Sequence, residues 1–78
     1  MQKTAKEMFE ELGYKAFGKS SEFVMYENQE HNYYITFKLS DRTIQVYKPH
    51  TTFDLIFYKE LQAINKQVEE LGWNNENS

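Results

Sequence analysis

The chain has 78 residues, of which 40% are hydrophobic and 17% aromatic, with no cysteine and a formal net charge of −3 at pH 7. This length fits one small domain with an aromatic core, and the absence of cysteine excludes a disulfide framework and a thiolate metal site. The mild acidity has the wrong sign for a strong phosphate binder. No apolar run approaches the roughly 20 residues that span a bilayer, and the N-terminal stretch does not resemble a signal segment, so we expect a cytoplasmic protein.

A short helix is expected near the N-terminus. Thr4 and Glu7 have the spacing of a capping box, in which the hydroxyl and the carboxylate each accept a backbone hydrogen bond. Gly13 supplies a residue that can take the left-handed conformation that ends a helix. The apolar stripe of this helix consists of Ala5, Met8, Phe9 and Leu12.

Stretches rich in aromatic and β-branched residues follow, and turn signals separate them. The predicted strands are Tyr14–Phe17, Phe23–Glu27, Tyr33–Ser40 and Thr43–Lys48. In the third strand Tyr33, Ile35, Phe37 and Leu39 alternate with Tyr34, Thr36, Lys38 and Ser40, which is typical of a strand with one face in the core. The short links between strands predict antiparallel hairpins.

The chain between Pro49 and the last helix allows two interpretations. Residues 52–56 form a fifth strand, or Thr51 caps a longer helix that begins near Phe53; the β-branched and aromatic content favours the strand. Five strands would leave the two helices parallel. The helix-end glutamates would then gather at one end of the molecule; they are Glu10, Glu11, Glu69 and Glu70.

The last helix is expected within Phe57–Trp73 and ends at Gly72. Its predicted apolar stripe is Phe57, Leu61, Ile64, Val68 and Leu71. The two endings, EELGY at Glu10–Tyr14 and EELGW at Glu69–Trp73, are near copies. We interpret them as the same helix-stop chemistry used twice rather than as an internal repeat, with the aromatic residue folding back on the last turn.

These elements predict an α+β fold over residues 1–73 in the order α-β-β-β-β-(β)-α, followed by a disordered polar tail at residues 74–78. The N-terminal and C-terminal helices pack on one face of an antiparallel four- or five-stranded meander. With this packing, Leu61→Ala or Ile64→Ala would each cost about 2–5 kcal/mol. The predicted core comprises Met8, Phe9, Leu12, Tyr33, Ile35, Phe37, Leu39, Ile44, Val46, Leu61, Ile64, Val68, Leu71 and Trp73.

Two segments resemble a group of small proteins encoded by phages and prophages of Gram-positive bacteria. They are TAKEMFEELGY at Thr4–Tyr14 and ELQAINKQVEELGW at Glu60–Trp73. The group has no assigned activity, so the resemblance implies no functional residue. It does imply an accessory protein that binds and redirects a host or phage protein, in a host-modulating or anti-defence role.

The titratable and nucleophilic residues do not form a recognisable catalytic motif. His31 and His50 lie in predicted turns without metal-ligand spacing, and Ser20 and Ser21 have no base nearby in the sequence. The three glycines stand alone and form no phosphate-binding motif. The sequence therefore predicts no enzyme, and no catalytic, cofactor-binding or metal-binding residue.

Two surfaces remain as candidate binding sites, because tyrosine is enriched at interfaces and clustered carboxylates suit a basic partner. The first is the outward sheet face, with either Met25 or Tyr26 beside five named residues: Tyr34, Thr36, Lys38, Gln45 and Tyr47. The second is the acidic patch of the four helix-end glutamates. An ordinary solvated surface is the alternative for both. The expected partner is an unidentified protein or a second copy of the chain; the alternative functions are a small single-stranded nucleic-acid binder and, after that, a small enzyme.

Overall fold

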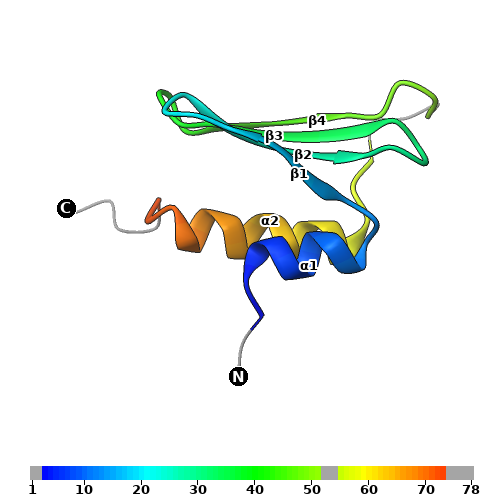
Figure 1. The fold of residues 1–78 in the computed structure, drawn as a ribbon, viewed down its shortest axis with the longest axis horizontal. Helices are drawn as coiled ribbons and strands as arrows, with labels where there is room; N and C mark the ends of the chain where they lie inside the picture. The colour runs from blue at the N-terminus through cyan, green and yellow to red at the C-terminus, as the bar shows by residue number, and fades with distance from the viewer. Residues whose placement is uncertain (1–2, 52–54, 74–78) are drawn as a thin grey trace.

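A computed structural model describes residues 3–51 and 55–73, which form four strands and two helices. The predicted α+β architecture is confirmed: an antiparallel meander in the order β1-β2-β3-β4, with both helices on one face (Figure 1). The elements are α1 (Ala5–Glu11), β1 (Lys15–Lys19), β2 (Phe23–Asn28), β3 (Tyr33–Lys38), β4 (Thr43–Tyr47) and α2 (Tyr58–Glu70).

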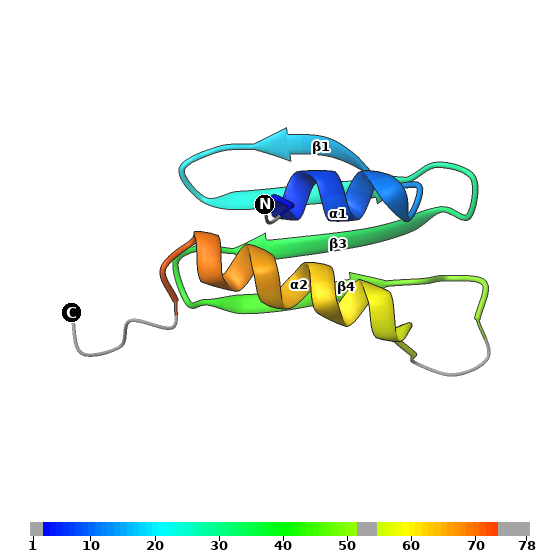
Figure 2. The same ribbon diagram turned by 90° about the horizontal axis from the view of Figure 1, so that it is seen from below.

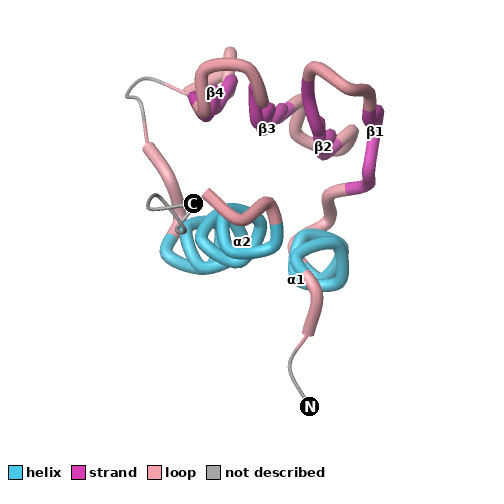
Figure 3. The backbone as a smooth tube through the Cα atoms, turned by 90° about the vertical axis from the view of Figure 1, so that its left-hand side faces the viewer, coloured by secondary structure: helices cyan, strands magenta, loops and turns pink. Residues whose placement is uncertain are grey.

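The two helices run antiparallel beneath the sheet. Seen from below, α1 lies towards β1 and β2, and α2 lies towards β3 and β4 (Figure 2). The end-on view shows the same two layers, with the helices side by side under the four strands (Figure 3). One face of the sheet is therefore covered, and the other faces away from both helices.

The helix ends follow the predicted chemistry. The backbone N–H of Thr4 donates to Glu7 Oε1 at 2.9 Å and that of Glu7 donates to Thr4 Oγ1 at 3.2 Å, so the capping box is present. The hydrogen bond from the Thr4 backbone lowers the pKa of Glu7 below its usual value. This cap fixes the start of α1.

The same C-terminal motif ends both helices. Gly13 and Gly72 both have positive φ, and the aromatic residue after each donates its backbone N–H back to the helix. Tyr14 donates to the Phe9 carbonyl at 2.9 Å and Trp73 donates to the Val68 carbonyl at 3.1 Å. These are the hydrogen bonds of a Schellman motif, which confirms the interpretation of the two near-identical endings.

The predicted fifth strand is wrong where the structure describes it. Residues 52–54 lie outside the described residues, as does the predicted tail at 74–78, but Leu55 and Ile56 belong to no strand. The alternative helix start near Phe53 is also not observed, since α2 begins at Tyr58 and the Thr51 hydroxyl donates to the Lys48 carbonyl within a turn. Four strands return the chain so that the helices are antiparallel rather than parallel.

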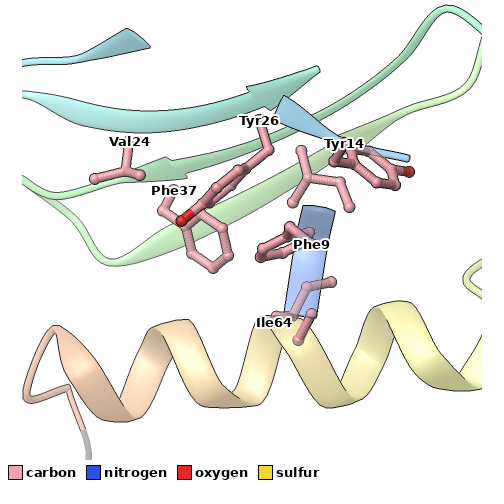
Figure 4. Close-up of a cluster of buried hydrophobic side chains, with 8 residues drawn as sticks. Phe9, Tyr14, Val24, Tyr26, Phe37 and Ile64 are labelled. Atoms are coloured by element: carbon pink, nitrogen blue, oxygen red, sulfur yellow. The ribbon is translucent and has the colours of Figure 1, made fainter. Parts of the chain in front are cut away.

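Phe9 is the centre of the core. Its ring stacks on Tyr26 with centroids 4.1 Å apart, and it meets Tyr14 and Phe37 edge to face at 5.6 and 6.2 Å (Figure 4). Such aromatic arrangements are worth about 0.5–1.5 kcal/mol each beyond the area they bury. The buried apolar side chains are Ala5, Phe9, Tyr14, Val24, Tyr26, Ile35, Phe37, Ala63 and Ile64.

The face that α2 presents to the core differs from the predicted stripe. On α2, Leu61 is exposed, whereas the polar residues Glu60 and Gln67 are buried. The physical reason is hydrogen bonding between α2 and two buried tyrosines. The Tyr14 hydroxyl donates to Glu60 Oε2 at 2.7 Å, and the Tyr26 hydroxyl donates to Gln67 Oε1 at 2.6 Å. Ile44, also predicted in the core, is exposed because β4 is an edge strand. The other predicted core residues lie in the core or pack partly buried against it.

Relative to the predicted stripe, α2 is rotated about its own axis, so two residues of that stripe differ in burial. Substitutions at these two residues are therefore expected to have different effects on stability. Ile64 is 4% exposed and Leu61 is 43% exposed. We expect Ile64→Ala to lower the free energy of unfolding by about 2–5 kcal/mol and Leu61→Ala by less than about 1 kcal/mol. Urea denaturation of the two variants beside the wild type measures both values. Equal losses in the two variants would contradict the observed rotation.

The buried tyrosines predict an alkaline loss of stability. Burial raises the pKa of Tyr14, and its hydrogen bond to Glu60 raises it further. Because the unfolded chain ionises its tyrosines near pH 10, the stability contributed by neutral Tyr14 is complete below about pH 10 and is lost as the pH rises above that value. We expect Tyr14→Phe to be less stable than the wild type at neutral pH and to lose stability less steeply above about pH 10. Denaturation at a series of pH values measures the slope.

Tyr58→Phe is the matched control for removing a phenolic hydroxyl, because Tyr58 is strongly exposed at the start of α2. We expect it to retain the wild-type pH dependence. A Tyr14→Phe slope equal to that of the wild type would show that the buried hydroxyl does not govern alkaline unfolding.

Candidate functional site

The predicted surface residues of β3 and β4 share the sheet face that points away from the helices. Tyr34 pairs with Tyr47 and Thr36 with Gln45, so these four alternate with the inward residues of the two strands. Lys38 pairs with Thr43 on the same face. On β2, Met25 is opposite Thr36 and joins this face, whereas Tyr26 is buried under it. The outer face is the set Met25, Tyr34, Thr36, Lys38, Gln45 and Tyr47.

Three aromatic rings form a row across the outer face. Phe17 and Tyr34 have ring centroids 6.2 Å apart, and so do Tyr34 and Tyr47. Phe17 is 59% exposed and Tyr47 is 54% exposed. We call Phe17, Tyr34 and Tyr47 the aromatic row. It crosses the sheet from the β1 edge to the β4 edge, so it offers an extended apolar surface.

The sequence did not identify Phe17 as part of this face. The register of β1 against β2 shifts between Ala16 and Gly18, so Phe17 is the extra residue of a bulge. Alternation along β1 already places Phe17 on the outer face, because Lys15 lies opposite Glu27 and the inward Ala16 lies opposite Tyr26. The bulge then places Gly18, opposite Met25, on the same face as Phe17. The available signal was the alternation in the first strand, which places Phe17 on the same face as Lys15 and opposite to that of Ala16.

Glu27 lies beside the aromatic row. The Tyr34 hydroxyl donates to Glu27 Oε2 at 2.9 Å, and this hydrogen bond raises the pKa of Tyr34. The bond fixes the orientation of the central ring of the row and places a carboxylate next to it. A ring that is already held in place loses less conformational entropy when a partner binds.

The other end of the outer face is polar. Lys38 Nζ lies 3.7 Å from Asp41 Oδ2, and the Thr43 hydroxyl donates to Asp41 Oδ1 at 2.8 Å. The hydrogen bond from Thr43 lowers the pKa of Asp41. A shallow hollow here is lined by Glu22, Phe23, Thr36, Lys38, Ser40, Thr43 and Gln45. The charge of Lys38 is therefore partly balanced by its neighbour.

The four helix-end glutamates do not gather at one end, because the helices are antiparallel (Figure 1). Glu70 Oε2 accepts the backbone N–H of Ala5 at 2.7 Å, so the end of α2 lies at the start of α1. Glu11, at the other end of α1, pairs with Lys3, and Glu69 pairs with Lys66. The predicted single acidic patch of Glu10, Glu11, Glu69 and Glu70 was therefore wrong in its geometry.

A buried ion pair joins the chain after β4 to the start of α2. The side chains of Lys48 and Glu60 are 3% and 4% exposed and contact each other. The Lys48 ammonium also lies over two aromatic rings, 4.7 Å from the Tyr33 centroid and 4.5 Å from the Phe57 centroid. The predicted apolar stripe of this helix does not include Glu60, and only its distant partners reveal its role.

Glu60 is fully engaged by groups within the protein. One carboxylate oxygen accepts from the Tyr14 hydroxyl, and the other accepts from Lys48 and from the Phe57 backbone N–H at 3.0 Å. Cation–π contacts add to the stabilisation of the desolvated ammonium. The arrangement binds α2 to the sheet and leaves neither oxygen of Glu60 without a partner. We therefore assign the cluster a structural role.

The histidines and serines take part in local packing and turns. His31 stacks on Tyr33 with centroids 5.2 Å apart, and His50 lies in an exposed turn. Ser20 Oγ accepts the backbone N–H of Glu22 at 3.0 Å. Within residues 3–51 and 55–73, no three His, Asp or Glu side chains are placed to hold a metal ion. In the same part of the chain, neither helix has the length and apolar character needed to cross a membrane.

Comparison of the chain with protein-family models, with curated proteins and with solved structures found no match.

The buried ion pair predicts strong coupling between Lys48 and Glu60. Lys48→Met leaves a buried carboxylate without its cation, and Glu60→Gln leaves a buried ammonium without its anion. We expect each single substitution to cost about 3–5 kcal/mol of unfolding free energy, and the double substitution to cost clearly less than the sum. Denaturation in a stabilising osmolyte keeps the variants folded enough to compare. Additive losses would show that the two charges do not stabilise each other.

Proposed function

We propose that this chain is a non-catalytic protein-binding module whose binding site is the outer sheet face. The observation that carries the proposal is the aromatic row, in which Tyr34 contacts both Phe17 and Tyr47 on the sheet face that neither helix covers. Aromatic side chains, and tyrosine above all, dominate binding energy at protein interfaces because they bury a large area with few rotatable bonds. A row spanning the sheet provides several such anchors on a rigid support.

The charges around the row favour a protein partner over a nucleic acid. Stacking of single-stranded bases on tyrosines is normally combined with a positively charged groove. Here Glu27 places a carboxylate beside Tyr34, Asp41 lies near Lys38, and the chain carries a net charge of −3. A phosphate backbone would be repelled along this path, whereas a protein surface with apolar and basic groups would fit it.

The resemblance to small phage and prophage proteins supplies the biological setting of the proposal. In that setting the module acts as an accessory protein in the cytoplasm of a bacterial host and binds a host or phage protein. The partner engages Phe17, Tyr34 and Tyr47 together, because the three rings lie in one continuous row.

Alanine substitution in the row tests the proposal. We expect an affinity-tagged wild-type chain to retain a specific protein from host lysate, and Tyr34→Ala/Tyr47→Ala to lose it, because truncating central aromatic anchors commonly costs about 2 kcal/mol or more each. The retained protein is then purified, and its affinity for each variant is measured directly by titration calorimetry. Loss of affinity by roughly thirtyfold or more is the expected result.

Tyr58→Ala is the control, because it removes an exposed tyrosine from the start of α2 rather than from the outer face. We expect it to retain the partner. Equal retention by the row variant and the control would move the site away from the outer face. Salt-sensitive binding to single-stranded DNA that the row variant abolishes would replace the protein partner with a nucleic acid.

A further inference from the structure

The two edges of the sheet differ in how they are protected. β1 carries Lys15 and Lys19 at its ends and a bulge at its centre, which are devices that prevent an edge strand from pairing with another chain. β4 has the sequence TIQVY, with no charge, no proline and an unbroken register against β3. In the described part of the chain, no strand pairs with the outer edge of β4. Its outward N–H and C=O groups are thus available for a further strand.

Apolar side chains collect at the β4 border of the molecule. Ile44 is exposed on the inward face of β4, and Val46 lines a hollow with Leu55 and Ile56. Leu61 is exposed on α2. Lys59 and Gln62 line the groove between α1 and α2, and helix geometry places Leu61 on the other side of α2, away from that groove. One uncharged strand edge and one apolar border therefore coincide.

We propose that β4 is the interface of a symmetric homodimer, in which β4 pairs antiparallel with β4 of a second copy about a two-fold axis at Gln45. The strand is self-complementary in this register. Ile44 lies opposite Val46 of the second copy on the inward face, and Thr43 lies opposite Tyr47 of the second copy on the outer face. Gln45 lies opposite itself.

A second copy fits this edge better than an unrelated strand for reasons of charge and symmetry. Two chains of net charge −3 repel each other over most of their surfaces, and β4 is a strand through which they can meet without opposing like charges. The two-fold operation satisfies both edges at once and leaves no exposed edge at the junction, so the assembly closes at two copies. The alternative edge would bring Lys15 opposite Lys19 of a second β1, which is unfavourable.

The dimer has a continuous eight-stranded sheet. Its inward side brings together Ile44, Val46 and Leu61 from both copies. On its outer side the two aromatic rows come close together, because Tyr47 of each copy lies opposite Thr43 of the other. This inference does not depend on the proposed partner, because it concerns the strand edge and is measured on the purified chain alone.

Charge substitutions at Gln45 test the dimer. Gln45 is exposed on the outer face, so the isolated chain accommodates Gln45→Lys and Gln45→Glu, but the two-fold axis places each new charge directly opposite its own copy. We expect sedimentation to show a wild-type dimer and to show that each charged variant dissociates at a concentration at least roughly tenfold higher than wild type. An equimolar mixture of the two variants, one of them labelled with nitrogen-15, is expected to restore a mixed dimer in native mass spectrometry.

Thr36→Lys is the matched control, since it adds the same charge beside Gln45 but on the central strand β3. We expect it to remain a dimer. A wild-type chain that stays monomeric over a roughly hundredfold concentration range, or charged variants that dimerise as well alone as when mixed, would overturn the proposal.

Amide hydrogen exchange of the wild type gives a second measurement that needs no substitution. On dilution we expect exchange to accelerate at alternate amides of residues 43–47 and to stay unchanged in β1. Acceleration in β1 with no change in β4 would place the interface elsewhere and would reject the β4 dimer.

Discussion

Two buried hydrogen bonds fix the rotation of α2, and much of the molecule depends on that rotation. Tyr14 and Tyr26 each direct a hydroxyl at an acceptor on α2, Glu60 for the first and Gln67 for the second. A buried polar group without a partner costs about 1–3 kcal/mol, so the helix cannot turn Leu61 inward without breaking both bonds. The tyrosines serve the core twice, since their rings also pack around Phe9. The same side chains thus supply apolar burial and orientational specificity.

The strand count is the second constraint, because it decides the direction of α2. With four strands the chain returns to the same end of the sheet at which it entered β1, and α2 runs back along α1 in the opposite direction. The carboxylate of Glu70 then reaches the first turn of α1, where a negative charge interacts favourably with the helix dipole. A glutamate near the C-terminus of its own helix is unfavourable there by itself, but in this fold it stabilises the start of the neighbouring helix. The antiparallel arrangement therefore turns part of the predicted acidic surface into an internal contact.

The features that the sequence predicted correctly are those that neighbouring residues determine. The Thr4 and Glu7 capping box, the two glycine endings and the alternation along β3 each involve residues a few positions apart, so their chemistry is visible in the sequence. The rotation of α2 is set by partners 46 and 41 residues away, and the apolar spacing of Leu61 and Ile64 carried no sign of them. Phe17 faces outward by the alternation of β1, but its contact with Tyr34 on β3 forms only in the folded sheet. Residues that meet only in the folded chain thus account for both the missed core polar groups and the missed member of the aromatic row.

The composition of the outer face then becomes the informative feature, because its exposure follows from the topology. Two short helices cover one side of the four-stranded sheet, and no helix in the described part of the chain covers the other side. An open antiparallel face is commonly polar, yet here three rings lie in contact across it, and a hydrogen bond to Glu27 holds the middle one. The rotation that buries Glu60 and Gln67 also leaves Leu61 at the β4 border, next to the one edge that carries no charge. Polar pairing in the core therefore determines where apolar surface remains exposed, and it links the stability of the fold to the two surfaces through which the chain can bind.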